Sequence, residues 1–103
     1  SEDLINFTIF CTLKPDVNKI EFFQKIMGQF PNTWVGWIVV DKPMIIVIFF
    51  ADSIKNIRKT EESLKKDPLI ISTEIITGGE GFYYPDWRTT KVDELAKDYL
   101  GKD

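Results

Sequence analysis

The residues of this 103-residue chain whose types suit chemistry lie mainly on predicted strands. Glu74 sits inside an Ile- and Thr-rich run, and period-2 alternation puts Ser72 and Ile76 on its side of that strand. If this side faces a closed interior, Glu74 is a half-buried carboxylate suited to acid–base catalysis. If the strand lies at a sheet edge, the same carboxylate is exposed and discourages edge-to-edge aggregation. The sequence leaves both interpretations open.

A second set of candidates lies on the first predicted strand. Thr8, Phe10 and Thr12 share one side of it. A few hydroxyl groups among apolar walls are typical of a small-molecule pocket. The same three side chains would also fit a dimer interface in which they only pack, so we expect a ligand site or an interface here.

Two tryptophans flank Gly36 on another predicted strand. Strict alternation predicts that Trp34 and Trp37 point to opposite faces of the sheet, so that only one of them reaches a given face. On that face a tryptophan would be a ligand platform or an interface anchor. We take Trp37 as the candidate ligand-binding residue.

The last candidate is an aromatic cluster with one guanidinium group. It consists of Tyr83, Tyr84, Trp87 and Arg88. Arg88 could bind an anionic ligand while the aromatic residues close a pocket mouth. Alternatively, the segment packs its rings onto a neighbouring surface.

Several kinds of site are excluded by residue types. The chain contains no histidine, which is the commonest general base and metal ligand. Cys11, the single cysteine, lies on the predicted core side, where it acts as a small hydrophobic residue. No acidic residues have metal-ligand spacing, and the glycines of residues 78–81 fit neither a P-loop nor a dinucleotide fingerprint. We therefore expect no metal and no cofactor.

Composition bounds the partners and the compartment. Thirteen basic and 16 acidic residues give a net charge of −3 and a pI near 4.9, which argues against nucleic-acid binding. The longest apolar run, Met44–Ala51, is far shorter than the roughly 20 residues that a membrane-spanning helix needs. With no signal-peptide pattern visible, we expect a cytoplasmic protein with no membrane partner.

The elements that must position the candidates follow from the hydrophobic period. Alternation and β-rich composition predict strands over 5–13, 34–40 and 69–77, the continuous apolar run predicts another over 44–51, and helical spacing predicts helices over 17–30 and 54–66. Asp16 or Asn18 is the candidate cap of the first helix, and Asp52 or Ser53 that of the second. In the first helix, Ile20, Phe23, Met27 and Phe30 form the expected buried face. We expect one domain over residues 1–103, with a core of about 5–77, then an aromatic turn and a C-terminal helix over 78–103.

The order of these elements predicts an α+β fold. Strand, helix, strand, strand, helix, strand is the ferredoxin-like βαββαβ pattern, a four-stranded antiparallel sheet with two helices on one face. Right-handed crossovers put the first and third strands in the middle. The other face of the sheet carries large apolar groups, each of which forgoes about 1.5–3 kcal/mol if it stays wet. We expect a second copy of the chain or the segment Phe82–Leu100 to cover it.

Residues 5–77, with this element order and an apolar open sheet face, resemble the dimeric α+β barrel superfamily, which includes antibiotic-biosynthesis-monooxygenase-like proteins. The resemblance implies a homodimer that binds a small apolar or aromatic molecule, as a cofactor-independent monooxygenase or isomerase whose pocket has polar and aromatic residues. The histidine of its haem-degrading members is missing here. Whether the chain is an enzyme stays open, and the alternative is a non-catalytic module for oligomerisation or protein interaction.

Residues 44–64 also resemble the third strand and second helix of an RNA-recognition motif. That module stacks bases on aromatic side chains. If Phe50 is the last aromatic residue of the third-strand signature, the stacking positions fall on Ile45 and Val47, which are aliphatic. RNA binding is therefore the least favoured function.

Overall fold

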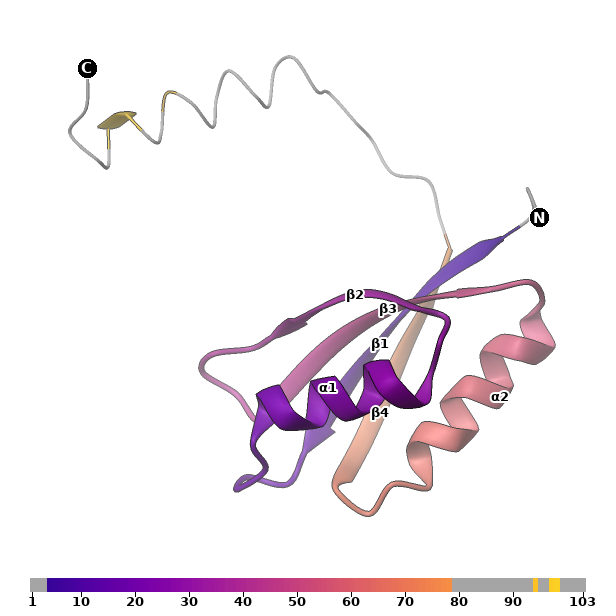
Figure 1. Cartoon of the computed structure of the whole chain (residues 1–103), viewed down its shortest axis with the longest axis horizontal. Helices are drawn as coiled ribbons and strands as arrows, with labels where there is room; N and C mark the ends of the chain where they lie inside the picture. Colours follow the sequence, from indigo (N-terminus) through magenta and orange to yellow (C-terminus); the bar gives the residue numbers. More distant parts are fainter. Residues whose placement is uncertain (1–3, 79–93, 95–96, 99–103) are drawn as a thin grey trace.

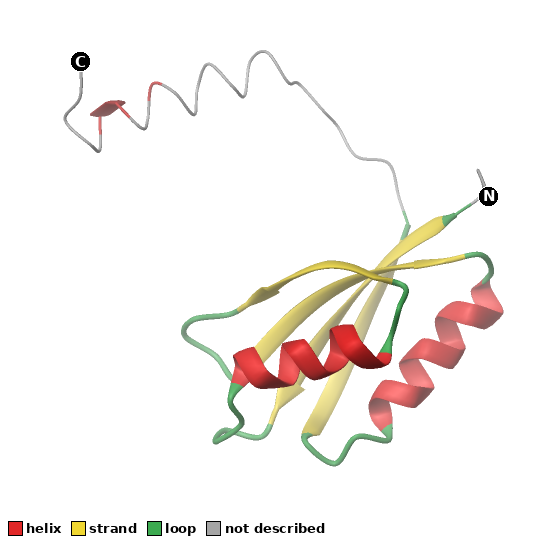
Figure 2. Cartoon of the chain, in the orientation of Figure 1, coloured by secondary structure: helices red, strands yellow, loops and turns green. Residues whose placement is uncertain are grey.

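The computed structural model of the chain describes residues 4–78 together with residues 94, 97 and 98. Residues 4–78 form a four-stranded antiparallel sheet in the order β2-β3-β1-β4, with α1 and α2 on the same side of it (Figures 1 and 2). The elements are β1 (Ile5–Leu13), α1 (Lys19–Gln29), β2 (Thr33–Ile38), β3 (Met44–Ala51), α2 (Ile54–Lys65) and β4 (Ile70–Thr77). This confirms the predicted α+β, ferredoxin-like class, with β1 and β3 in the centre.

The helix starts are determined by local capping. The Asn18 side chain accepts a hydrogen bond from the Glu21 amide at 3.1 Å, so α1 begins two residues later than its apolar period suggested. The Ser53 hydroxyl accepts one from the Asn56 amide at 3.2 Å and starts α2. Of the capping pairs that the sequence offered, the second residue caps in both cases.

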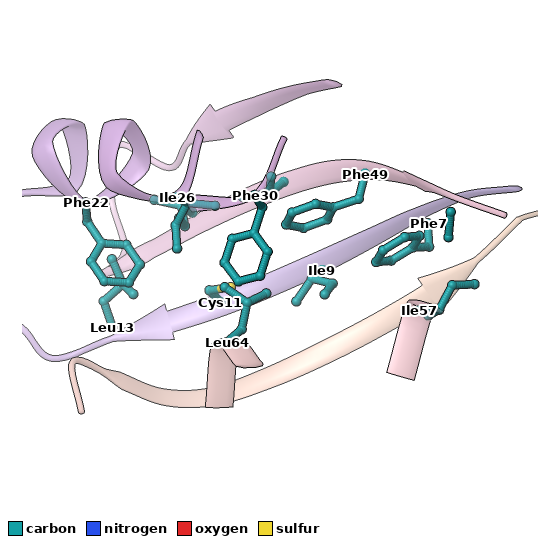
Figure 3. Packing of buried hydrophobic residues seen from close by; sticks show 13 residues of the cluster. Phe7, Ile9, Cys11, Leu13, Phe22, Ile26, Phe30, Phe49, Ile57 and Leu64 are labelled. Carbon is teal, nitrogen blue, oxygen red and sulfur yellow. The ribbon is translucent and has the colours of Figure 1, made fainter. Parts of the chain in front are cut away.

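The core lies between the sheet and the helices and is built around β1 and β3. Phe49 of β3 stacks on Phe7 of β1 with ring centroids 5.2 Å apart and meets Phe30 edge-on at 5.9 Å (Figure 3). Cys11 lies in the same buried cluster, and burial raises the pKa of its thiol to about 12. The prediction that Cys11 is a small core residue is therefore confirmed.

The buried face of α1 differs from the prediction. The buried residues are Phe22, Ile26 and Phe30, and Phe23 is half-buried. Ile20 and Met27, expected in the core, are 59% and 46% exposed. Both stripes have helical spacing and share Phe30, and the observed rotation of the helix packs Phe22 and Ile26 against the sheet in place of Ile20 and Met27.

Gly36 allows α1 to lie close to β2. A Cβ atom at this position would lie 2.5 Å from the Ile46 carbonyl oxygen and 2.5 Å from the Phe23 ring. Gly36→Ala is therefore expected to lower the free energy of unfolding by about 1–3 kcal/mol, measured by urea denaturation. Gly28→Ala is the control: a Cβ at Gly28 of α1 meets nothing within 4 Å, so that variant should be stabilised by about 0.5–1 kcal/mol. Equal effects of the two substitutions would contradict this close contact.

Residues in the C-terminal part are described only in places. Glu94, Lys97 and Asp98, within the predicted last helix, have helical backbone. The remainder of that helix and the aromatic turn lie outside the described residues. No helix formed by the described residues is long and apolar enough to cross a membrane.

Candidate functional site

The candidate site is the side of the sheet that faces away from α1 and α2, which we call the open face. Its residues alternate along each strand with the buried core residues. Because α1 and α2 pack on the opposite side, no element within residues 4–78 lies over this face. The register assigns to it Asn6, Thr8, Phe10, Thr12, Val35, Trp37, Met44, Ile46, Ile48, Phe50, Ser72, Glu74 and Ile76.

The strand register brings three of the predicted site residues into one row across the open face. Trp37 pairs with Ile46, Ile46 pairs with Phe10, and Phe10 pairs with Glu74. Neighbouring strands are about 4.8 Å apart, so the row spans about 14 Å from β2 to β4. We call this set, Trp37, Ile46, Phe10 and Glu74, the central row.

The two predicted threonines flank the central row. Thr8 and Thr12 lie two residues before and after Phe10 on β1, on the same face. Both are half-buried between the neighbouring strands. The open face is thus an apolar surface with hydroxyl groups close to its centre.

Glu74 lies on the edge strand β4 and is exposed. It is the single charged side chain among the residues that the register assigns to the open face. The edge position and exposure agree with the second of the two interpretations drawn from the sequence. Enclosure of Glu74 would require a covering layer on this face.

The expectation that Trp34 and Trp37 point to opposite faces is wrong. The register of β2 against β3 shifts between Thr33 and Val35, which marks a β-bulge at Trp34. The Trp34 ring lies 5.2 Å from the ring of Phe50, an open-face residue, so both indoles lie on the open side. They are 62% and 54% exposed. Strict alternation fails here because a bulge adds one residue to the strand, and the isolated Gly36 within the strand is the residue type that signals such an irregularity.

Other predicted candidates are not brought to the site. Arg88, Tyr83, Tyr84 and Trp87 lie outside the described residues, as does most of the segment Phe82–Leu100 proposed as a cover. Cys11 points to the core, away from Phe10. Within the described residues, no group of three or more His, Cys, Asp or Glu side chains could hold a metal ion. Trp34, which the sequence offered only as the alternative to Trp37, also lies on the open face, together with Ile46 and Ile48, which no sequence pattern singled out.

A cleft of about 600 Å³ adjoins the open face at Phe50, between α2 and the α1–β2 turn. Asn32 donates a hydrogen bond to the Phe50 carbonyl at 2.8 Å on its wall. Asn56 donates one to Asp52 at 2.6 Å, and the hydrogen bonds from Asn56 and Ser53 lower the pKa of the Asp52 carboxyl. These side chains are already paired with one another, which is typical of a capped helix start rather than of a catalytic centre.

An ion pair fixes the helices beneath the sheet. Lys25 of α1 meets Asp67, after α2, at 2.8 Å, and the Leu69 amide donates to the same carboxylate at 2.9 Å. Burial of Asp67, whose side chain is 10% exposed, opposes ionisation. The hydrogen bonds from Lys25 and Leu69 and the Lys25 charge outweigh burial and lower its pKa below the ordinary 3.8.

This lowered pKa predicts an acid dependence of stability. The folded state binds the Asp67 proton less tightly than the unfolded chain, so the stabilisation is fully present above pH 3.8 and is lost as pH falls through the folded-state pKa. Asp67→Asn should flatten this loss in urea denaturation measured at stepped pH. Glu62→Gln, an exposed position on α2, is the control and should keep the wild-type profile. An unchanged profile for Asp67→Asn would contradict the role of this pair.

Comparisons with known proteins assign the chain to no family. No protein-family model matches the chain, and no curated protein sequence matches it. Among solved structures, the chain is similar to the crystal structure of a NIPSNAP family protein from Agrobacterium tumefaciens, with 14% identity and a TM-score of 0.49. That similarity covers 80% of this chain and 90% of the other. At this identity and score, the similarity says nothing about the activity of this chain. Its own sheet topology and element order make it a small α+β protein with a ferredoxin-like fold.

Proposed function

We propose that this protein is a homodimer whose two open faces meet and enclose a small apolar or aromatic molecule. The observation that carries the proposal is the open face itself. Apolar side chains occupy its centre, and the polar groups set among and beside them are hydroxyl groups, the Asn6 amide and one carboxylate. A surface of this kind is typical of an interface or a ligand site.

The apolar content makes a cover energetically favourable. Phe10 and, on β3, Met44, Ile46, Ile48 and Phe50 are half-buried in the single chain. Full burial of a large apolar side chain contributes about 1.5–3 kcal/mol, so completing the burial of five of them is comparable with the net stability of a small domain, about 5–15 kcal/mol.

The size of the face fits a second copy. Its strands have up to nine residues, and at about 3.3 Å per residue and 4.8 Å per strand the sheet covers about 500 Å². Two copies would bury about 1,000 Å², the lower limit for a specific interface. A second copy offers a face of the same area and the same low charge, whereas a strongly charged partner would find one carboxylate to pair with.

Binding is favoured over catalysis by the side chains that the face offers. Cys11 is buried on the other side and its thiol stays protonated at neutral pH, so it cannot act as a nucleophile for a ligand there. Among the described open-face residues, Glu74 alone could transfer a proton. The monooxygenase or isomerase chemistry implied by the sequence resemblance would have to depend on Glu74.

A second candidate function is self-association without a ligand. It is favoured by the four apolar residues that β3 places on the open face. These side chains could interdigitate with those of a second copy and leave no space between the sheets. The two functions differ in whether anything remains inside the dimer.

Native mass spectrometry of the full chain after gentle purification tests both candidates. A dimer of twice 12.0 kDa with additional bound mass supports the proposed function. A dimer without additional mass favours self-association alone, and a bare monomer overturns both. If mass is retained, Thr12→Val on the open face should reduce its occupancy, whereas Thr73→Val on the helix side of β4 should not.

A further inference from the structure

We propose that the molecule bound at the open face is an organic cation: an ammonium group joined to an apolar or aromatic body. This inference rests on the proposed function, because it needs the open face to be covered. It adds the chemical class of the ligand and the residue that selects it, Glu74.

The central row supplies the shape of the site. An indole, an aliphatic side chain and a phenyl ring lie in line on three adjacent strands, and the Glu74 carboxylate ends the line on the fourth. The distance from Trp37 to Phe10 is two strand spacings, about 10 Å. The row therefore accommodates an apolar body of up to about that length over Trp37, Ile46 and Phe10, with a polar end at Glu74.

The charge of the face determines the sign of the ligand. Glu74 is its single charged side chain within the described residues, and no lysine or arginine lies on this face. Closing two copies over each other would remove water from a carboxylate in each copy. An unpaired charge in such a space is strongly unfavourable, whereas an ammonium group beside it offsets the loss of water.

Three lysines of the described residues are engaged away from the open face. Lys25 pairs with Asp67 at 2.8 Å and Lys65 with Glu61 at 3.7 Å, both on the helix side. Lys19 donates hydrogen bonds to the carbonyls of Val39 and, at 2.9 Å, of Lys42. Among the residues that the register assigns to the open face, none offers Glu74 a positive charge.

The aromatic residues of the open face also favour a positively charged ligand. Ring faces of tryptophan and phenylalanine attract cations. Trp37 and Phe10 lie on either side of Ile46 in the central row, and Trp34 lies against Phe50 on the same face. An anionic ligand would meet the carboxylate and the negative ring faces together.

Three probes that share one apolar body test the inference on the full chain: 4-phenylbutylammonium, 4-phenylbutanol and 4-phenylbutanoate. Isothermal titration calorimetry should show the ammonium binding at least about tenfold more tightly than the alcohol, with the carboxylate weakest. Glu74→Gln should reduce the affinity for the ammonium to the level of the affinity for the alcohol. The affinity for the alcohol itself should not change. Glu62→Gln, exposed on α2, should alter none of the three affinities.

The outcomes separate this inference from the proposed function. Equal affinities for the alcohol and the ammonium would overturn the inference and leave the ligand-binding dimer standing. A preference for the ammonium that persists in Glu74→Gln would have the same consequence. Failure of all three probes to bind, together with a monomer in native mass spectrometry, would overturn both.

Discussion

Replacing Phe49 with alanine is expected to remove a large part of the chain's free energy of unfolding. Phe49 is fully buried in central strand β3, stacked on Phe7 and in edge contact with Phe30. Removal of a buried phenyl ring costs about 3–5 kcal/mol, including the cavity that it leaves. A domain of this size has about 5–15 kcal/mol in total, so the loss is between about a fifth and the whole of its stability. Circular dichroism during urea denaturation measures the effect.

Phe50→Ala is the matched control for Phe49→Ala. The two phenylalanines are neighbours on β3 and point to opposite sides of the sheet. Phe50 is half-buried and contacts the exposed Trp34, so its removal should cost the folded monomer about 1 kcal/mol. Equal losses of unfolding free energy for the two variants would show that the helix side is not the main core.

Ile48→Glu is expected to convert the proposed dimer into a folded monomer. Ile48 lies on central strand β3, on the open face beside Thr8 and Val35. Each copy would bring a carboxylate without a partner into the apolar centre of the interface, at several kcal/mol per charge. The association constant of the dimer should fall by at least about a thousandfold, since each 1.4 kcal/mol is tenfold. Analytical ultracentrifugation measures the association, and circular dichroism checks the fold.

Ile20→Glu controls for the added charge in this experiment. Ile20 is an exposed position of α1 on the side of the molecule opposite the open face. The same substitution there should leave the association constant unchanged. A dimer that survives Ile48→Glu but is lost in Ile20→Glu would place the interface on the helices and overturn the proposed function.

The sequence by itself determined the elements and their order. The range 5–13 agrees with β1, because adjacent strand residues point to opposite faces and leave a period of two in the residue types. The range 44–51 agrees with β3, because a short continuous apolar run bounded by turn residues is typical of a buried strand. Asn18 and Ser53 were among the residues that the sequence offered as helix caps. The apolar character of Met44–Ala51 predicted its central position and the exposure of an apolar open face.

The candidate site was predictable only in part. Thr8, Phe10 and Thr12 could be grouped because they lie on one strand, where alternation decides the face. Their alignment with Glu74 and Trp37 could not be predicted, since cross-strand register depends on hydrogen bonds between segments far apart in the chain.

Tertiary structure alone decided the bulge at Trp34, the rotation of α1 and the central row. Trp34 joins the open face because β2 gains one residue against β3. Phe22 and Ile26 are buried in place of Ile20 and Met27, because contact with the sheet selects one of two possible apolar stripes. The period of apolar residues along a segment reflects the backbone geometry of that segment alone. Strand register and helix rotation instead depend on contacts between segments, and those contacts exist only in the folded chain.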